Sequence, residues 1–249
     1  MLKVSIVSYL NTAPFILGIE KCGLMNDSNF LISKDYPSEC ARKLIDGEVD
    51  LGLVPVAILP YLKNYQIHGS TCISASGKVD SVVLLSDVPI NEIEEIVLDY
   101  QSRTSVQLCR ILAKELWKIS PKFIPANENT MNEIGEKRAI VLIGDRVFDQ
   151  LGRFNYVTDL SEEWTKLTGL PFVFAVWASA KPINTKLQEE FEAALQFGLN
   201  NLEEAIENAS KIYPEYYPVE NYLRNRISYK LDSQKRKGLE TFLAYLGKL

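Results

Sequence analysis

The turn Asp99–Ser105 has residue types and a spacing suited to binding an anion. The apolar run Ile96–Leu98 ends there, and apolar residues then recur at helical spacing from Val106 onward. Ser102 stands at the position expected for the N-cap of this helix, and Arg103 follows it. The first N–H groups of a helix lack intrahelical partners and carry partial positive charge, so this turn suits a carboxylate or a phosphate. The alternative is an ordinary capped helix whose arginine faces water.

Two other turns offer polar groups directly after strand-like apolar runs. Asn11 and Thr12 follow the run Val4–Val7; the Asn11 amide is both a donor and an acceptor, and Thr12 adds a hydroxyl. Gly144 and Asp145 follow a second such run, and the backbone N–H groups of their turn suit a carboxylate. Ligands of open parallel α/β sheets bind at the carboxyl ends of strands. Capping of the next helix by Asn11, Thr12 or Asp145 is the alternative interpretation.

The common templates for phosphate binding and nucleophilic catalysis are missing from the sequence. It has no Gly-x-Gly-x-x-Gly, Walker or Gly-x-Ser-x-Gly motif. The one histidine, His68, lies in a strand-like segment without an evident partner, so we expect it to be structural. The four cysteines form no Cys-x-x-Cys pair, which indicates free thiols and no zinc site. We therefore predict a site without metal or cofactor, in which amides, hydroxyls, backbone donors, carboxylates or the substrate itself do the chemistry.

Composition narrows the classes of partner. The formal net charge is −5 and no stripe of Lys and Arg occurs, which argues against binding nucleic acid. No apolar run approaches the ~20 residues needed to span a bilayer, and no signal peptide is visible. We expect a soluble, cytoplasmic protein that binds a small molecule and has neither a nucleic-acid nor a membrane partner. The sequence carries no indication of an oligomeric state.

Strand-like and helical segments alternate along the first two-thirds of the chain. The order strand, helix, strand over residues 30–54 predicts a parallel α/β sheet, and the pattern from Asn184 onward is helical. Turn residues at Ser81–Pro89 and Thr168–Pro171 indicate crossings between two lobes. We expect one lobe to comprise residues 1–85 and 175–249, with the C-terminal helices, and an inserted lobe to comprise residues 86–174. A ligand is then expected in the cleft between the lobes.

Several segments together resemble the chorismate dehydratases of the futalosine route to menaquinone. The most specific are the run Trp-x3-Thr-Gly-Leu-Pro-Phe-x-Phe-Ala-x-Trp at residues 164–177 and the turn Ser102–Ser105. The others are Ser8–Pro14, Gly47–Pro55, Ile143–Asp145 and Asp159–Trp164. The resemblance implies a type II periplasmic-binding-protein-like fold, in which two α/β lobes surround a central ligand cleft and C-terminal helices follow.

The resemblance also implies a lyase reaction in menaquinone biosynthesis. Chorismate, a small anionic substrate, would lose water to give 3-[(1-carboxyvinyl)oxy]benzoate, and this dehydration needs no cofactor. The polar residues implicated in the family correspond to Asn11 and Ser81, which we predict to be catalytic. Because no suitable histidine is present, we hypothesise that a carboxylate of the substrate removes the ring proton. The residues predicted to bind the substrate are Tyr9, Thr12, Pro55, Ser102, Arg103, Thr104, Ser105, Gly144 and Asp145.

Three alternatives compete with the dehydratase. The first is the enzyme of the same pathway that makes 1,4-dihydroxy-6-naphthoate, which would want an acid/base side chain in its cleft. The second is a non-catalytic small-anion-binding protein; the missing export signal and lipoprotein cysteine argue against it. The third is the ligand-sensing domain of a transcription regulator, which should carry a helix-turn-helix segment that this sequence does not show.

Overall fold

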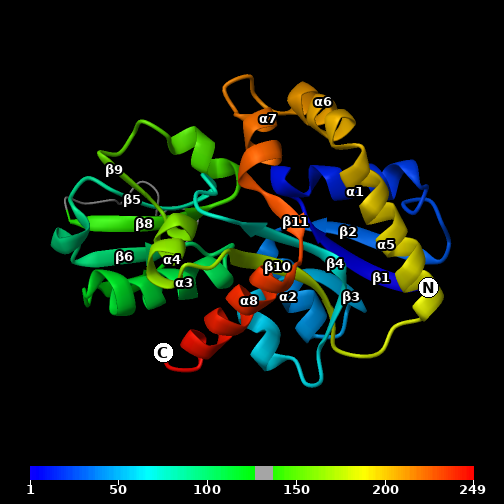
Figure 1. The fold of residues 1–249 in the computed structure, drawn as a ribbon, viewed down its shortest axis with the longest axis horizontal. Coiled ribbons are helices and arrows are strands. Elements are labelled where there is room, and N and C mark those ends of the chain that lie inside the picture. Colours follow the sequence, from blue (N-terminus) through cyan, green and yellow to red (C-terminus); the bar gives the residue numbers. More distant parts are fainter. Residues whose placement is uncertain (127–136) are drawn as a thin grey trace. The chain divides into compact units, whose positions relative to one another are not determined.

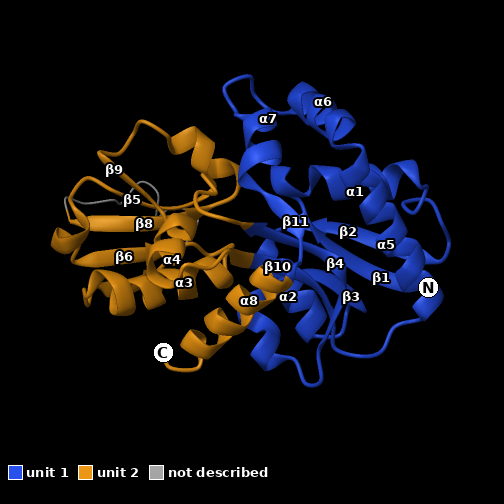
Figure 2. Cartoon of the chain, viewed as in Figure 1, with its two compact units in different colours: residues 1–74, 174–232 blue, residues 75–173, 233–249 orange. Residues whose placement is uncertain are grey.

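The computed structural model describes residues 1–126 and 137–249 and divides into two compact units (Figure 2). The first unit comprises residues 1–74 and 174–232, and the second comprises residues 75–173 and 233–249. Each unit has its own β-sheet with packed helices, so the α/β class predicted from the sequence is confirmed. In the described part of the chain, no helix is both long and apolar enough to cross a bilayer.

The first unit is built on a mixed sheet, which has six strands among the described residues in the order β11-β4-β10-β3-β1-β2 (Figure 1). β1 is parallel to β2 and to β3, as the sequence pattern predicted, whereas β10 and β11 run antiparallel to their neighbours β3 and β4. The carboxyl ends of β1, β2 and β3 therefore share one edge of this sheet. The strands are β1 (Leu2–Val7), β2 (Phe30–Asp35), β3 (Leu51–Pro55), β4 (Gln66–Ala75), β10 (Phe172–Ser179) and β11 (Ser228–Lys230).

Two helices of the first unit, α1 (Ala13–Lys21) and α5 (Thr185–Asn200), pack closely together. Gly18 permits this approach, because a Cβ atom at that position would stand 1.9 Å from the carbonyl oxygen of Ala194. The close pair fixes α1, and with it the turn that joins α1 to the end of β1. The other helices are α2 (Pro37–Ile45), α6 (Leu202–Ile212), α7 (Val219–Asn221), the 3-10 helices η1 (Leu10–Thr12) and η2 (Val56–Tyr61), and the π-helix η7 (Tyr222–Arg226).

The second unit has a sheet of five strands among its described residues, in the order β7-β6-β8-β5-β9. β6 is parallel to β7 and β8, and β5 is antiparallel to β8 and β9. The carboxyl ends of β6 and β8 therefore meet at one edge, beside the start of β5. The strands are β5 (Val82–Ser86), β6 (Glu95–Leu98), β7 (Lys122–Pro125), β8 (Arg138–Ile143) and β9 (Tyr156–Asp159).

The observed division of the chain differs from the expected lobes at two segments. Residues 75–85 belong to the second unit, where β5 is hydrogen-bonded between β8 and β9. Helix α8 (Ser233–Leu246) also belongs there, because the Phe242 ring packs at 6.2 Å from that of Trp164 and 5.2 Å from that of Phe172. The remaining helices are η3 (Ile90–Glu92), α3 (Thr104–Leu112), the π-helix η4 (Ala113–Trp117), η6 (Asp145–Gln150) and α4 (Leu160–Thr168).

Candidate functional site

In the first unit, the predicted site residues follow the carboxyl end of β1. The chain turns there into η1, and the Thr12 hydroxyl lies 2.7 Å from the carbonyl oxygen of Val7 and 2.8 Å from that of Tyr9, to which it donates. Thr12 is fully buried, so its side chain holds the turn together. Tyr9 is half-buried, and Pro55 is buried at the end of β3.

Asn11 has polar capacity that its surroundings leave unused. The residue is half-buried, and its carboxamide oxygen Oδ1 is buried without a hydrogen-bond partner among the described residues. Most buried polar atoms in folded proteins have a partner, and leaving one unbonded costs about 1–3 kcal/mol. A buried oxygen of this kind at a strand's carboxyl end is suited to accept a hydrogen bond from a ligand.

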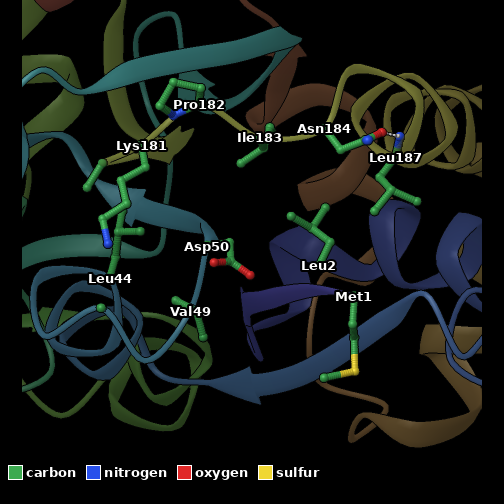
Figure 3. A pocket seen from close by; sticks show the side chains of 12 residues that line it. Met1, Leu2, Leu44, Val49, Asp50, Lys181, Pro182, Ile183, Asn184 and Leu187 are labelled. Carbon is green, nitrogen blue, oxygen red and sulfur yellow. Dashed lines mark hydrogen bonds between the residues drawn. The ribbon is translucent and has the colours of Figure 1, made fainter.

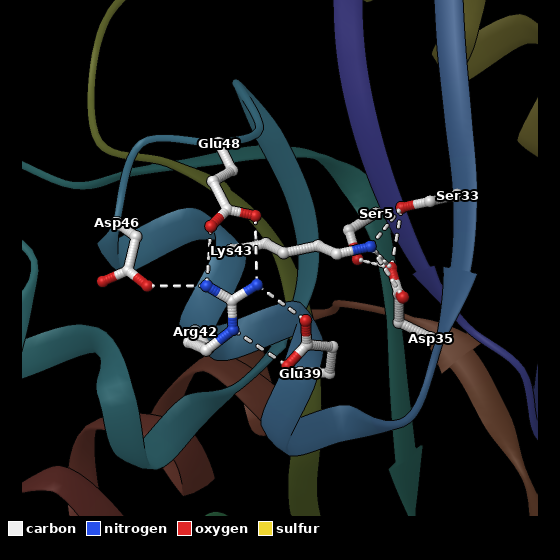
Figure 4. Close-up of polar contacts among 8 residues, drawn as sticks. All are labelled: Ser5, Ser33, Asp35, Glu39, Arg42, Lys43, Asp46 and Glu48. Atoms are coloured by element: carbon white, nitrogen blue, oxygen red, sulfur yellow. Dashed lines mark hydrogen bonds and ion pairs between the residues drawn. The ribbon is translucent and has the colours of Figure 1, made fainter.

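A network around Asp35 fixes the backbone next to this turn. Figure 4 shows Lys43 and two serines converging on the Asp35 carboxylate. Lys43 Nζ lies 2.7 Å from both carboxylate oxygens, and the hydroxyls of Ser5 and Ser33 donate to Oδ2 at 2.8 and 2.7 Å. Burial by itself raises the pKa of Asp35, but these donors together hold that pKa below its ordinary value. The carbonyl oxygen of Asp35 accepts from the Ser8 N–H at 2.9 Å, so the network ends at the start of the turn.

In the second unit, Ser81 is held between two other elements. It is buried, and its carbonyl oxygen accepts a hydrogen bond of 2.9 Å from the Gly144 N–H. The N–H groups of Val79 and Asp80 both donate to Asp159 Oδ2, at 2.9 and 2.7 Å. Asp80 has a φ of 63°, a left-handed conformation that these bonds stabilise just before Ser81. The same Asp159 caps α4, and its burial raises its pKa although backbone N–H groups lower it.

The turn between β6 and α3 is capped as the sequence predicted. Ser102 Oγ accepts from the Ser105 N–H at 3.0 Å, while α3 itself begins at Thr104. Ser102, Thr104 and Ser105 are buried, whereas Arg103 is exposed. The Ser102 side chain therefore caps the start of α3, and three hydroxyl residues lie buried around it.

Asp99 joins this turn to the one that follows β8. Its carboxylate accepts from the N–H of Gln101 at 2.9 Å and from the N–H of Ile143 at 3.0 Å. Arg146 Nη2 adds a third bond, of 2.6 Å, and the Asp99 side chain is only 1% exposed. Sequence analysis did not assign a role to Asp99 or Arg146. The available signal was an aspartate directly after one buried strand and an arginine shortly after another.

The turn after β8 differs from the expectation in one respect. Gly144 has a φ of 73°, in the region that favours glycine, and its N–H was expected to bind a carboxylate. In the structure that N–H donates to Ser81 instead, so it holds the two segments together. Asp145 is the first residue of η6 and does not cap it through its side chain.

The predicted site residues thus form two groups, one in each unit. The first unit holds Tyr9, Asn11 and Thr12 on one turn, with Pro55 at the end of β3. The second unit brings Ser81, Gly144 and the Ser102–Ser105 turn together around the ends of β6 and β8.

The hollows found in the first unit lie largely apart from these residues. The larger, of about 350 Å³, lies at the amino ends of β1 and β3 and contains none of the predicted site residues (Figure 3). A smaller one, of about 200 Å³, lies between α1 and α6 and includes Tyr9 in its wall. The amino ends of β1 and β3 are the sheet edge opposite the Asn11 turn, so the larger hollow is separate from that turn.

Other reactive side chains lie in surroundings that suppress their reactivity. His68 is buried on β4, with Nε2 2.7 Å from Ser179 Oγ, and burial lowers its pKa. Burial raises the pKa of the Cys40 and Cys109 thiols to about 12, so they are protonated at neutral pH. Within residues 1–126 and 137–249, no three His, Cys, Asp or Glu side chains are grouped to hold a metal ion.

Comparison with known proteins places the chain in a family. The family model described as menaquinone biosynthesis matches residues 2–248. The chain belongs to the menaquinone biosynthesis family. A chorismate dehydratase from Thermus thermophilus is 29% identical, over 94% of this chain and 96% of that protein.

Solved structures show the fold that this family member shares. Protein AF1704 from Archaeoglobus fulgidus matches with a TM-score of 0.77 at 16% identity, covering 99% of this chain and 97% of the other. CA3427 from Candida albicans, described as having the generic periplasmic binding protein fold, matches at 0.66 with 14% identity, covering 100% and 90%. The alkanesulfonate-binding protein SsuA from Xanthomonas axonopodis matches at 0.63 with 15% identity, covering 98% and 92%. The predicted periplasmic-binding-protein-like fold is confirmed.

Proposed function

We propose that this member of the menaquinone biosynthesis family is a chorismate dehydratase, a lyase that converts chorismate to 3-[(1-carboxyvinyl)oxy]benzoate and water. The observation that carries the proposal is the match to a chorismate dehydratase along almost the whole of both chains. The family model supports the same pathway over residues 2–248. A cytoplasmic location, as expected from the sequence, belongs to the proposal.

The second unit supplies groups suited to a substrate that carries two carboxylates. The capped turn Ser102–Ser105 starts a helix, where partial positive charge and hydroxyl groups favour an anion. Ser81 lies beside Gly144 on the same side of that sheet's strand ends. We assign carboxylate binding to the turn and contact with the reacting ring to Ser81.

We propose a second catalytic role for Asn11 of the first unit. Its unbonded Oδ1 is suited to accept a hydrogen bond from the ring hydroxyl of chorismate, and its amide N–H₂ is suited to donate to that oxygen as it leaves. The reaction breaks the C–O bond of that hydroxyl and the ring C–H bond beside the ether; the hydroxyl and the proton leave as water, and the ring becomes aromatic. The proton acceptor in this proposal is a substrate carboxylate, held in place by the enzyme.

Turnover of chorismate by the purified protein tests the proposal directly. Wild-type protein is expected to form the enolpyruvyl benzoate, detected by chromatography and mass. Asn11→Asp places a negative charge beside a dianion and is expected to abolish turnover, at least about a hundredfold, since electrostatic contacts in active sites are worth that much. The matched control Asn26→Asp adds the same charge on the exposed surface of the first unit and should leave turnover unchanged.

Three outcomes would change this proposal or part of it. Tight binding of chorismate without turnover would make the protein a small-anion-binding protein, the second candidate, which the likeness to binding proteins such as SsuA favours. Near-normal turnover by Asn11→Asp would remove Asn11 from the mechanism while leaving the dehydratase assignment in place. An enzyme that makes 1,4-dihydroxy-6-naphthoate would leave chorismate unchanged.

A further inference from the structure

Arg146 is held in a fixed place beside the capped turn of the second unit. Its Nη2 atom lies 2.6 Å from Asp99 Oδ2, and its guanidinium carbon lies 5.6 Å from the centroid of the Tyr100 ring. The carbonyl oxygen of Asp99 accepts from the Ser102 N–H at 3.2 Å, so the same residue orients the turn and the arginine. An arginine with an ion pair on one side and a ring on another has little freedom to move.

The two side chains of this ion pair differ in solvent exposure. The Asp99 side chain is 1% exposed, whereas the Arg146 side chain is 33% exposed. A guanidinium has five N–H donors in a planar fork, and its geometry matches a carboxylate. The Arg146 side chain is therefore partly exposed next to a turn that is itself suited to an anion. Because the protein has a net charge of −5, a dianionic ligand needs a local cation of this kind.

Other arginines near the turn are less well placed for this role. Arg103 is in the turn but exposed, and no bond to the strand ends fixes it among those described. Arg110 is packed at 4.3 Å over the Phe123 ring, on the helix that follows. The Asp99 carboxylate, just after β6, bonds both Arg146 and the N–H of Ile143 at the end of β8. Arg146 is therefore held beside the ends of both strands.

We propose that the Arg146 guanidinium binds one of the two carboxylates of the substrate, and that Asp99 is a positioning residue that holds Arg146 beside the Ser102–Ser105 turn. This inference rests on the proposed function, because it takes a dicarboxylate as the ligand. It makes Arg146 a determinant of specificity for dianions over monoanions.

Equilibrium binding of three ligands tests the role of Arg146 without requiring turnover. The ligands are 3-[(1-carboxyvinyl)oxy]benzoate, with both carboxylates, and two analogues that each lack one, 3-vinyloxybenzoate and 2-phenoxyacrylate. Titration calorimetry on the full chain is expected to show that Arg146→Gln weakens the dicarboxylate at least about tenfold, the loss of a charge-assisted hydrogen bond. Arg146→Gln should weaken the binding of one analogue by the same factor and leave the affinity for the other unchanged. The analogue that is weakened carries the carboxylate that Arg146 binds.

Three further variants separate binding from folding. Arg153→Gln changes an exposed arginine that bonds Gln150 in the same unit and is expected to bind all three ligands like the wild type. Asp99→Asn/Arg146→Gln removes both charges together, so no buried carboxylate loses its cation, and it is expected to show the same selective loss. Arg146→Lys keeps the charge without the planar fork and should recover part of the affinity. Thermal unfolding of each variant reports whether it is folded.

Asp99→Asn tests positioning. It keeps the Arg146 cation but loses the carboxylate that orients it, so KM for chorismate should rise more than kcat falls, and the affected carboxylate should be the one identified with Arg146→Gln. Equal losses for all three ligands, or no loss in folded Arg146→Gln, would overturn the inference while leaving the proposed function intact. Wild-type protein that binds none of the three ligands and leaves chorismate unchanged would overturn both.

Discussion

Each unit contains an aspartate that forms an ion pair, half-buried Asp35 in the first and buried Asp99 in the second, and the two hydrogen-bond networks connect different parts of the fold. Asp35, at the end of β2, accepts from two serine hydroxyls and from Lys43, all of them side chains. Asp99, after β6, accepts from the backbone N–H groups of Gln101 and Ile143 and from Arg146. A carboxylate that bonds side chains fixes a helix against strands, whereas one that bonds backbone fixes the path of two turns.

The cations of the two networks, Lys43 and Arg146, also differ in exposure. The Lys43 side chain is 19% exposed against 33% for Arg146, and Lys43 Nζ donates to Ser33 Oγ as well as to both Asp35 carboxylate oxygens. Under the proposed role of Arg146, the first network contributes to stability alone, whereas the second contributes to both stability and ligand binding. Variants at the two sites should separate these effects.

Removal of the Asp99 carboxylate is expected to have the largest effect. Asp99→Ala takes the carboxylate acceptor from the buried Ile143 N–H, the partly buried Gln101 N–H and Arg146, so the free energy of unfolding should fall by about 3 kcal/mol. Affinity for the dicarboxylate should fall as well, because both turns lose their shared anchor. Urea unfolding and calorimetry measure the two losses. Asp35→Ala is the matched variant. It keeps the backbone bond from the Ser8 N–H to the carbonyl oxygen of residue 35, so a loss of stability with unchanged affinity is expected. A comparable loss of affinity would erase the distinction between the networks.

Removal of the Lys43 cation is expected to have a smaller effect. Lys43→Met keeps the aliphatic stem but leaves the Asp35 carboxylate with only its serine donors, so unfolding should become easier by about 1–2 kcal/mol. Lys34→Met is the control, because the Lys34–Glu20 pair is exposed and worth about 0.5 kcal/mol or less. Urea unfolding compares the two. If they lose the same stability, the Asp35 network contributes no more than a surface ion pair.

Some hydrogen bonds around Asp99 follow from local sequence patterns, and others do not. The cap at Ser102 was predicted because its partner, Ser105, lies three residues away, and capping depends on local residue types. The bonds from Asp99 to Ile143 and Arg146 join residues 44 and 47 positions apart, and no local pattern specifies them. The Gly144 N–H was assigned to a ligand for the same reason, because its acceptor Ser81 lies far away in the sequence, just before β5.

Strands and their parallel pairing were predicted more completely from the sequence than the division into two units. Apolar runs identified the strands, and the strand–helix–strand order identified their parallel pairing around β1. The placement of α8 depends on Phe242 packing against Trp164, which is tertiary and has no signature in the helix itself. The roles of the predicted site residues in catalysis and binding stay predictions.

The contribution of the Asp35 network to the free energy of unfolding should depend on pH. The Asp35 pKa in the folded protein lies below its ordinary value of 3.8, so the folded state favours the ionised form and its stabilising contribution is present above about pH 4. That contribution should be lost as the pH falls through the lower folded pKa. Lys43→Met removes the main cation, so the difference in unfolding free energy between wild type and variant should narrow on acidification from pH 6 towards about pH 3. A constant difference across this range would show that Lys43 stabilises by packing and not by charge.

Substitution of His68 should have the smallest effect on stability, and it should leave chorismate turnover unchanged. Burial holds its pKa below the ordinary 6.5, so the unfolded chain takes up the proton more readily and wild-type stability should fall as pH drops below about 6.5. His68→Gln removes this titration and keeps a polar group for Ser179, so the loss of stability between pH 7 and about pH 5 should shrink while chorismate turnover stays at the wild-type level. A folded His68→Gln protein without turnover would give the protein the acid/base side chain that the naphthoate-forming alternative requires. The active centre would then include β4 of the first unit, and the contrast between the two aspartate networks would no longer identify the groups that act on the ligand.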